Sequence, residues 1–387
     1  MTTTTPLLDL LDAHIAEGSM PGAVALVARD GRTEVATAGT AGLAGSAPMR
    51  RDSVFRIASV TKPIVAAAAM TLVEDGLIAP ADPVAAWLPE LSAPLVVRTP
   101  RSPVDDVVPA LRPITLLDLL TFRAGYGIPS DFSLPAAAPL LGELRQAPPP
   151  GAVLAPDAWM AALSRVPLLH QPGDGWLYNT CSDILGVLVS RVAGRPLPAY
   201  LAERLFEPLG MNDTGFAVEP AALDRFTSCY RPGADSGSEP VLVDAPDGRW
   251  SSPPAFPSGA GGLVSTVDDL AAFGRMLLAE GLDDAGDRVL AGESVRQMIT
   301  DHLTPEQRAA SGLFTEGQGW GFGGSVDIEI TAPWNVLGRY GWVGGTGTTA
   351  HVIPATGTVA VLLTQMKMTG PTAPGVMRDF WTYAAGF

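Results

Sequence analysis

The sequence predicts an α+β fold in which one sheet is assembled from both ends of the chain. Strand-like runs lie near the N-terminus, at residues 22–39, and in the last quarter of the chain, at residues 319–364, whereas helical patterns dominate the middle. Because packed layers enclose a shared core, this order predicts a sheet domain made of residues 1–80 and 258–387. A mostly helical insertion domain with long loops is predicted at residues 81–257. We expect the functional site in the cleft between the two domains.

Length and composition are those of a globular protein. The chain has 387 residues, of which 47% are hydrophobic and 17% charged, so it can bury a sizeable core in one or two domains. Its net charge of −15 argues against a nucleic acid or an anionic membrane surface as a partner. We therefore expect a small-molecule partner. The sequence does not indicate an oligomeric state.

Motifs for cofactors, metals and export are missing from the sequence. The two cysteines, Cys181 and Cys229, form no C-x-x-C pair, which suits a reducing compartment. Residues 1–18 lack the basic start and apolar run of a signal peptide, and no apolar run reaches membrane-spanning length, so we expect a cytoplasmic protein. The four histidines are far apart, and there is no H-E-x-x-H, no P-loop and no G-x-S-x-G. We expect neither a metal nor a cofactor.

The first elements are a helix and a hairpin. Residues 5–17 carry leucines and an isoleucine at helical spacing, and Gly18 ends the pattern. Residues 22–28 are continuously apolar, as in a buried strand, and Asp30-Gly31 is a hairpin turn that leads into a return strand at residues 33–39.

The middle of the chain alternates helices with proline-rich segments. Prolines recur through residues 92–113 and again through residues 129–156, so both stretches are expected to be loops. Thr115 and Asp118 form a capping box that starts a helix. Asn179, Thr180 or Ser182 is expected to cap a later helix that Gly194 ends. Other helices are expected at residues 159–165 and 197–206. No strands are expected between about residues 80 and 215, and a long loop is expected at residues 231–262.

The last part is rich in strands between two helices. Thr266 and Asp269 resemble another capping box, opening a helix that runs to Gly281. An amphipathic helix closes the chain, starting at residue 374 or 376 and running to residue 385. Strands are expected at residues 319–330, 336–345, 348–353 and 358–364.

The strongest chemical signal is the S-x-x-K pair Ser59 and Lys62. Residues three apart lie on one helical face, so a hydroxyl and an amine are placed side by side, which is the minimum that a serine nucleophile needs. Pro63 is tolerated only in a first helical turn, so the helix should begin at about Ser59, where backbone N–H groups and the helix dipole favour an oxyanion. Alternatively, Ser59 is an ordinary helix cap. Lysine occurs elsewhere only at position 367, and unlike arginine it can give up its proton when desolvated.

Two further segments can complete such a site. Tyr178 lies in a polar turn at a helix start, and a phenol and an ammonium have similar reference pKa values of about 10 and 10.4, so they can share a proton. Glycines at residues 344, 345 and 347 let a substrate carbonyl approach the backbone, with the N–H groups of Ser59 and Gly345 as donors. The alternatives are a half-buried aromatic side chain for Tyr178 and a simple glycine-rich hairpin for residues 344–347.

In this order, the motifs resemble the serine β-lactamase and penicillin-binding-protein superfamily, and they are most similar to the class C β-lactamase-like esterases, the family VIII carboxylesterases. The resemblance spans nearly the whole chain, in the segments Phe55–Pro63, Leu119–Gly125, Pro172-Gly173 before Tyr178, Pro257–Gly262 and Gly319–Gly323. It implies a β-lactamase/transpeptidase-like fold with an antiparallel sheet flanked by helices. It also implies Ser59 as the acyl-forming nucleophile, Lys62 with Tyr178 as the general acid/base pair, and an oxyanion hole at Ser59 and Gly345.

Two departures from the lactamase pattern affect the expected substrate. The lactamase Y-x-N motif would place asparagine where Thr180 stands, and the K-T-G triad is matched by Trp342-Val343-Gly344, as in the esterases. Trp342 replaces the cation that would face a substrate carboxylate with an apolar wall. Arg123 or Arg339 could restore an anion contact. The pocket residues expected from this resemblance are Trp342, Val343, Gly344, Tyr126 and Thr180.

These observations favour a serine hydrolase acting through an acyl-enzyme, and specifically a carboxylesterase for small neutral esters. One alternative is an acyltransferase, transesterase or peptide cyclase of secondary metabolism. Another is a weak β-lactamase, a D-aminopeptidase or a DD-peptidase. A catalytically silent binding module on the same fold is a further alternative.

Overall fold

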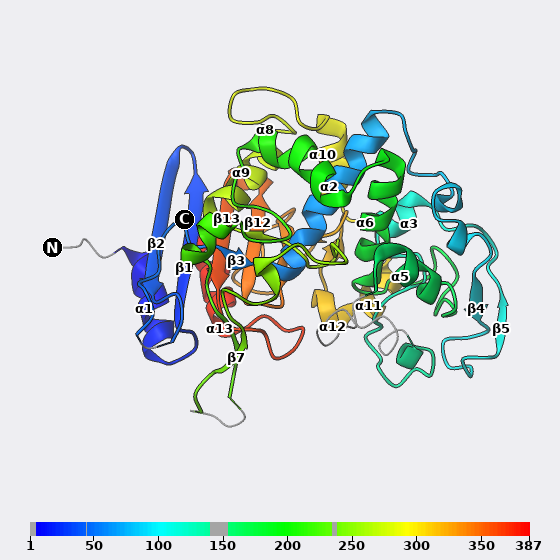
Figure 1. Ribbon diagram of the computed structural model, residues 1–387, viewed down its shortest axis with the longest axis horizontal. Coiled ribbons are helices and arrows are strands. Elements are labelled where there is room, and N and C mark those ends of the chain that lie inside the picture. Colours follow the sequence, from blue (N-terminus) through cyan, green and yellow to red (C-terminus); the bar gives the residue numbers. More distant parts are fainter. Residues whose placement is uncertain (1–4, 44, 140–153, 234–237) are drawn as a thin grey trace.

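Figure 1 shows the computed structural model, which describes residues 5–43, 45–139, 154–233 and 238–387. Within the loop predicted at residues 129–156, residues 140–153 lie outside the described parts, as do residues 234–237 of the loop predicted at 231–262. No helix in the described ranges combines the length and the apolar character needed to cross a bilayer.

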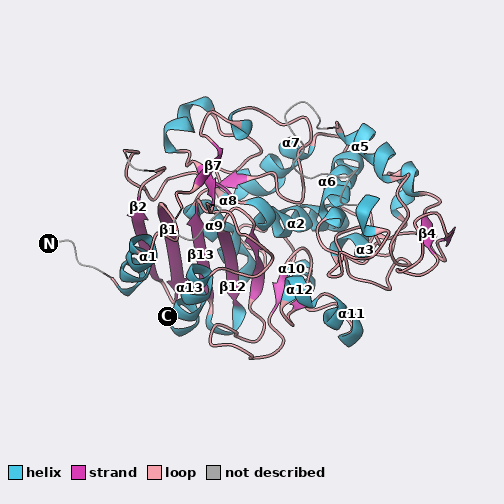
Figure 2. Cartoon of the chain, turned by 90° about the horizontal axis from the view of Figure 1, so that it is seen from below, coloured by secondary structure: helices cyan, strands magenta, loops and turns pink. Residues whose placement is uncertain are grey.

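A seven-stranded sheet forms one half of the molecule (Figure 2). Every neighbouring pair of its strands is antiparallel, and the N-terminal hairpin joins the last strand of the chain through β1 and β13. This confirms the predicted α+β fold with a sheet drawn from both chain ends. Across the sheet, the strands are β2 (Arg32–Gly39), β1 (Gly22–Arg29), β13 (Thr358–Thr364), β12 (Thr348–Ile353), β11 (Tyr340–Gly344), β10 (Ser325–Val326) and β9 (Gly319–Trp320).

Helices cover both faces of this sheet. In β1, Ala23 and Ala25 face a core formed with α1 (Pro6–Ala16) and α13 (Gly375–Gly386), whereas Val24 and Leu26 face a core that includes α9 (Val267–Leu278). Successive strand residues point to opposite faces, so a strand covered on both sides is apolar throughout. The unbroken apolar run at residues 22–28 is thereby explained.

Helix α2 (Thr61–Glu74) connects the sheet to the helical half. All its residues from Thr61 to Leu72 are buried, and it packs against α6 (Thr180–Ala193). In Figure 1, α2 runs through the middle of the molecule, with the sheet on one side and α6 on the other. The remaining helices of that half include α3 (Leu116–Leu120), α5 (Pro156–Leu163), α7 (Leu197–Leu201) and α8 (Glu207–Leu209). The domain boundaries after residues 80 and 257 stay a prediction.

Two stretches predicted as loops contain strands. β4 (Leu95–Val97) pairs with β5 (Val107–Pro109), and β6 (Cys229–Arg231) pairs with β7 (Val241–Asp244). The prediction of no strands between residues 80 and 215 is therefore wrong. Both segments hold β-branched valines, and a two-stranded ribbon consists only of edge strands, where proline is tolerated. The single strand predicted at residues 319–330 is instead two short strands, β9 and β10, of two residues each.

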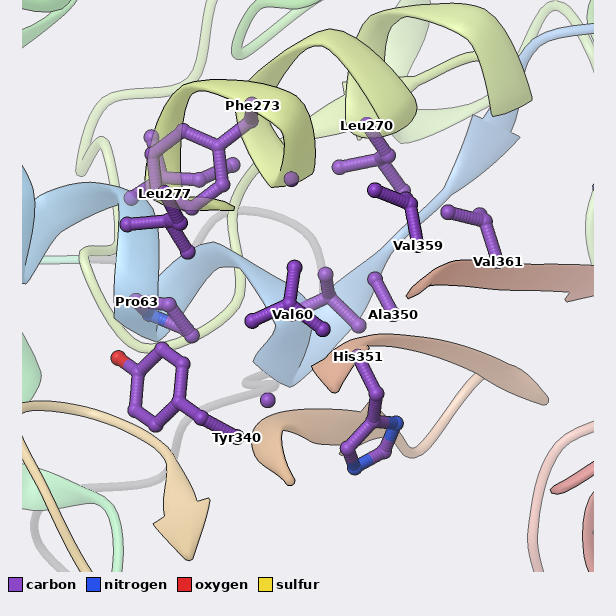
Figure 3. Close-up of a pocket in the computed structure, with 14 residues that line it drawn as sticks. Val60, Pro63, Leu270, Phe273, Leu277, Tyr340, Ala350, His351, Val359 and Val361 are labelled. Atoms are coloured by element: carbon purple, nitrogen blue, oxygen red, sulfur yellow. The ribbon is translucent and has the colours of Figure 1, made fainter. Parts of the chain in front are cut away.

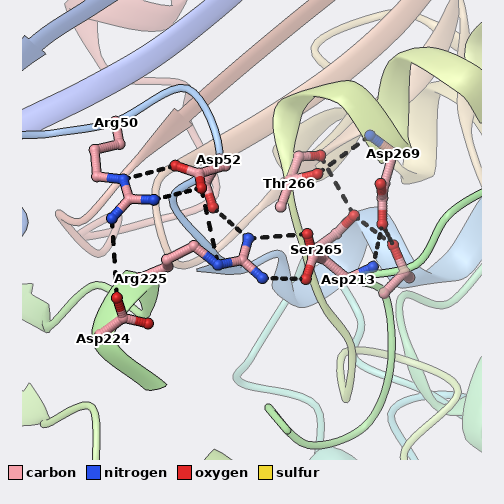
Figure 4. A network of polar contacts seen from close by, with 9 residues as sticks. Arg50, Asp52, Asp213, Asp224, Arg225, Ser265, Thr266 and Asp269 are labelled. Carbon is pink, nitrogen blue, oxygen red and sulfur yellow. Dashed lines mark hydrogen bonds and ion pairs between the residues drawn. The ribbon is translucent and has the colours of Figure 1, made fainter. Parts of the chain in front are cut away.

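Of two predicted capping boxes, one forms in full and the other forms only in part. Thr115 and Asp118 form the full capping box at α3. At α9, Thr266 accepts from the Asp269 backbone as predicted, but the Asp269 carboxylate instead accepts from the Asp213 backbone N–H at 2.9 Å and from Thr214 at 2.8 Å. Figure 4 shows this network. In it, Arg225 donates to the Asp213 carboxylate and to the backbone carbonyl of Asp52, which precedes Ser59 in the chain.

A buried ion pair fixes the strand that leads into the S-x-x-K segment. Arg56 lies in β3 (Phe55–Arg56), which pairs with β8 (Val264–Ser265). Its guanidinium pairs with Asp244, donates to the carbonyl of Ala245 at 2.8 Å and lies 3.9 Å from the ring centroid of Phe226. The Arg56 side chain is 2% exposed, so both charges depend on each other for solvation.

Removing this arginine should destabilise the protein strongly. Arg56→Met leaves the Asp244 carboxylate buried without its cation, a change that typically costs about 3–5 kcal/mol. Arg98→Met is the matched control, because Arg98 pairs with Asp106 at the surface, where such pairs contribute little. Urea unfolding measures both variants, and similar losses in the two would contradict the role given to the buried pair.

Candidate active site

Ser59 and Lys62 are brought together at the start of α2. Ser59 lies in a single 3-10 turn, Ala58–Val60, and the α-helix begins at Thr61, two residues later than predicted. Ala58 adopts a φ of 44°, a left-handed conformation that costs free energy for a non-glycine residue and turns the chain sharply before the serine. Lys62 Nζ lies 2.7 Å from Ser59 Oγ, so the side-by-side arrangement predicted from the spacing is present.

The Lys62 amine is buried and poorly solvated. The residue has no exposed surface, and Nζ donates to the carbonyl oxygen of Ala260 at 2.6 Å in addition to its contact with Ser59. Desolvation lowers the pKa of Lys62 from 10.5 to about 7, although the negative charge of Asp183 opposes this change. A substantial fraction of the amine is therefore neutral at physiological pH and able to accept a proton.

Tyr178 stands immediately before α6 on a strained turn. The N–H of Thr180 donates to the Tyr178 carbonyl at 3.2 Å, and Asn179 between them has φ 85° and ψ −61°, the rare γ-turn with positive φ. Asn179 takes the cap position of α6 but makes none of the predicted side-chain cap bonds. This turn sets the orientation of Tyr178 relative to α6, which begins two residues later.

The Tyr178 hydroxyl lies between Ser59 and Trp342. It hydrogen-bonds the Ser59 side chain, and Trp342 Nε1 donates to it at 2.8 Å. Lys62 Nζ lies 4.8 Å from the centroid of its ring. Burial raises the pKa of Tyr178, and the hydrogen bonds from Ser59 and Trp342 oppose that rise. Of the pair that the sequence predicts can share a proton, the structure thus favours a neutral amine beside a protonated phenol.

The glycine segment after Trp342 packs directly on the turn that leads to Ser59. A Cβ at Gly344 would lie 2.3 Å from the carbonyl oxygen of Ile57, so only glycine fits there, and the Thr348 hydroxyl donates to that carbonyl at 3.0 Å. Gly345 is exposed and has open space around its Cα. The end of β11 therefore lies beside the residues that precede Ser59, as an oxyanion hole built from Ser59 and Gly345 requires.

The other predicted pocket residues have different surroundings. Trp342 is buried and Val343 half-buried. Thr180 begins α6 and is 4% exposed, and Tyr126 is 1% exposed with a pKa raised by burial, so both side chains belong to the core.

The two arginines considered for an anion contact differ in their surroundings. Arg339 is held in a buried ion pair with Asp327. Arg123 donates through Nε to the Thr121 hydroxyl at 2.9 Å, and burial lowers its pKa. The described part of the chain also has no group of three or more histidine, cysteine or acidic residues placed to hold a metal ion.

Sequence reasoning missed an aromatic wall beside Tyr178. Phe314, from the short helix α12 (Gly312–Thr315), stacks on the Tyr178 ring with centroids 4.7 Å apart and planes at 22°. The preceding helix α11 (Pro305–Ala310) is tied to the turn before Tyr178, because Gln307 donates to the carbonyl of Gly173 at 2.8 Å. The other rings of this wall are Phe122, Trp176, Trp320 and Trp342. Contacts between residues so distant in sequence leave no local pattern.

A small apolar cavity lies behind the nucleophile turn (Figure 3). Val60 and Pro63 line it together with Leu270 and Phe273 of α9 and Tyr340 of β11, and its volume is about 30 Å³. This space is about that of one water molecule, and its walls are apolar. Ser59, Lys62 and Tyr178 are not among its lining residues, so this cavity is separate from the candidate site.

Comparisons with known proteins identify relatives of this chain. A family model described as Beta-lactamase matches residues 7–375. Protein Rv1367c of Mycobacterium tuberculosis is 39% identical over 358 residues, covering 90% of this chain and 86% of that protein. Esterase EstB of Burkholderia gladioli is 32% identical over 396 residues, covering 94% of this chain and 91% of that protein. The solved structure of EstCE1, described as a hydrolase with promiscuous acyltransferase activity, has a TM-score of 0.79 at 26% identity and covers 97% of both chains.

Replacing the buried amine should stabilise the fold at neutral pH. Lys62 has a pKa of about 7 when folded against its ordinary 10.5, so between these values the unfolded chain binds more protons and stability rises with pH. The desolvation cost is therefore greatest at and below pH 7. We expect Lys62→Met to raise the free energy of unfolding by about 4 kcal/mol at pH 7, with a gain that shrinks towards pH 10. Urea unfolding at pH 7 and 9.5 tests this; an equal gain at both pH values would show that the pKa is not depressed.

Proposed function

Since the chain belongs to the beta-lactamase family, we propose that it is a serine hydrolase working through an acyl-enzyme, with small neutral carboxylic esters as substrates. The observation that carries this proposal is the contact of 2.7 Å between a Lys62 amine with a pKa of about 7 and the Ser59 hydroxyl. A serine becomes a nucleophile when an adjacent neutral base can take its proton.

In the acylation step, Ser59 Oγ attacks the ester carbonyl while its proton passes to the neutral Lys62 amine. The carbonyl oxygen becomes an oxyanion that the backbone N–H groups of Ser59 and Gly345 stabilise. The C–O bond to the alcohol then breaks, and the leaving alkoxide takes the proton of the Tyr178 hydroxyl. The Lys62 ammonium then passes the proton that it took from Ser59 to the Tyr178 oxygen. Both groups are therefore neutral when hydrolysis of the acyl-enzyme begins. Water then attacks the acyl carbon and gives a proton to the Lys62 amine. The bond between the acyl carbon and Ser59 Oγ breaks, Lys62 passes that proton to Ser59 Oγ, and the carboxylic acid is released.

A neutral substrate is favoured by the groups around the nucleophile. Trp342 presents an indole N–H to Tyr178 where the lactamases have a lysine, and the guanidinium of Arg339 is already paired with Asp327. A substrate carboxylate would therefore be desolvated without a partner from these groups. The name of Esterase EstB, a relative at 32% identity, supports ester hydrolysis over β-lactam cleavage.

Acyl transfer to an alcohol is the second candidate. Phe314 is only half-buried beside Tyr178, so its ring can contact an apolar acceptor and limit the access of water to the acyl-enzyme. The acyltransferase activity in the description of EstCE1 points in the same direction. The two reactions share the acyl-enzyme and differ only in the nucleophile that resolves it.

The purified protein should hydrolyse p-nitrophenyl acetate and butyrate. We expect Ser59→Ala to lose about 10³-fold or more in kcat/KM, Lys62→Ala a similar amount, and Tyr178→Phe about 10²-fold. In wild type, kcat/KM should rise with pH through an apparent pKa near 7, because only the neutral amine accepts a proton. Full activity in Ser59→Ala would overturn the assignment. Intact mass after incubation with esters and with nitrocefin shows which compounds acylate Ser59, and we expect little β-lactam turnover.

Partition between water and an added alcohol tests acyl transfer. With a p-nitrophenyl butyrate donor and a bulky cyclic alcohol, we expect a transfer product in addition to butyric acid. Phe314→Ala should lower the ratio of transfer to hydrolysis severalfold, because it opens the aromatic wall to water, whereas Leu313→Ala, at the neighbouring exposed residue, should leave the ratio unchanged. Product ratios measured by chromatography decide the question, and butyric acid as the sole product would exclude transfer with this acceptor.

A further inference from the structure

A carboxylate with no role in the reaction described above lies close behind Lys62. Asp183 stands in the first turn of α6 and is 2% exposed. Its Oδ1 accepts a hydrogen bond from the Ser258 hydroxyl at 2.6 Å and another from the backbone N–H of Ala260 at 3.0 Å. Asp183 thus holds the short segment 258–260, which leads into the sheet domain, against the helix that follows Tyr178.

The same segment provides the acceptor for the lysine. The carbonyl oxygen of Ala260 accepts from Lys62 Nζ at 2.6 Å, so the residue is held by Asp183 through its N–H and by Lys62 through its carbonyl. The segment also packs tightly on α6, because a Cβ at Gly259 would lie 2.3 Å from the carbonyl oxygen of Ser182. With contacts on both sides, Ala260 is fixed relative to α2 and α6 together.

A neutral lysine amine has two N–H groups and one lone pair. To act as a base on Ser59, the lone pair must point at Oγ, and an N–H group then has to be taken by another acceptor. The Ala260 carbonyl is in the position to do this. Its placement therefore controls the orientation of the amine, and a loss of alignment lowers the rate of proton transfer without removing the base.

We propose that Asp183 is a positioning residue, which orients the Lys62 amine towards Ser59 by anchoring the segment Ser258–Ala260. This inference rests on the proposed function, in which Lys62 is the base. The charge of Asp183 contributes a second effect, because it supports the protonated form of Lys62 against desolvation. The groups around the amine that can gain or lose a proton are Ser59, Tyr178 and Asp183. Ser258 and the indole of Trp342, which also lie nearby, are neutral.

Asp183→Asn keeps the side-chain oxygen but removes the charge. We expect kcat for p-nitrophenyl butyrate to fall by about tenfold with KM within about twofold. The acid limb of the pH profile should move to lower pH, since the loss of a neighbouring negative charge lowers the pKa of Lys62 further. Ser258→Ala removes one anchoring bond without changing the charge, so it should lower kcat less and leave the limb in place.

Asp269→Asn is the matched control. Asp269 also lies in the first turn of a helix, is buried, and accepts from one backbone N–H and one hydroxyl, as Figure 4 shows. It should lower the melting temperature without moving the pH profile. If Asp183→Asn also changes only the melting temperature, or leaves both kcat and the acid limb unchanged, Asp183 has a structural role and the proposal fails.

A stability measurement decides the proposal even if the wild type turns over no ester. In that outcome the proposed function fails, but a double-mutant cycle of Asp183→Asn and Lys62→Met still measures the coupling of the two side chains. We expect the stability gained by Lys62→Met at pH 7 to be larger in the Asp183→Asn background, because the amine there is more costly to keep protonated. Additive effects within error would overturn the inference.

Discussion

The burial of one amine underlies the arrangement of the whole site. Lys62 is inaccessible to water, and its hydrogen bonds go to Ser59 and Ala260. A charged lysine is unfavourable in such a place, so burial lowers the pKa of Lys62 to about 7. About half of the amine is therefore neutral near pH 7. The packing of α2 against the sheet and α6 sustains this state, and a looser interface would hydrate the amine and restore its ordinary pKa.

Residues from distant parts of the chain converge on that amine. Ser59 comes from the turn that Arg56 and Gly344 hold in place, and Tyr178 and Asp183 come from the start of α6. Trp342 comes from β11 and meets Tyr178 across the boundary between the sheet and the helices. Because these groups come from three separate parts of the chain, the geometry of the site depends on how those parts pack together.

The sequence predicts the parts of this structure that depend on local rules. Hairpin chemistry at Asp30-Gly31, capping at Thr115 and the spacing of Ser59 and Lys62 each involve residues close in sequence, and the structure contains all three features. The prolines at residues 92–113 predict a loop, but β4 and β5 pair there because a ribbon of edge strands accommodates proline. The protonation states of Lys62 and Tyr178, and the contacts of Phe314 and Asp183, follow from burial and tertiary packing, for which a single sequence carries no local signal.

The pairing of β1 with β13 has a consequence for biosynthesis. β1 ends at Arg29, and its partner strand spans residues 358–364, so one edge of the N-terminal hairpin has no partner until nearly the whole chain has been made. At ribosomal rates of about 5–20 residues per second, this interval lasts on the order of tens of seconds. Throughout that time an apolar strand edge is open to other nascent chains. Because β1 pairs with a strand more than 300 residues later, its edge stays unpaired until the segment of β13 has been made.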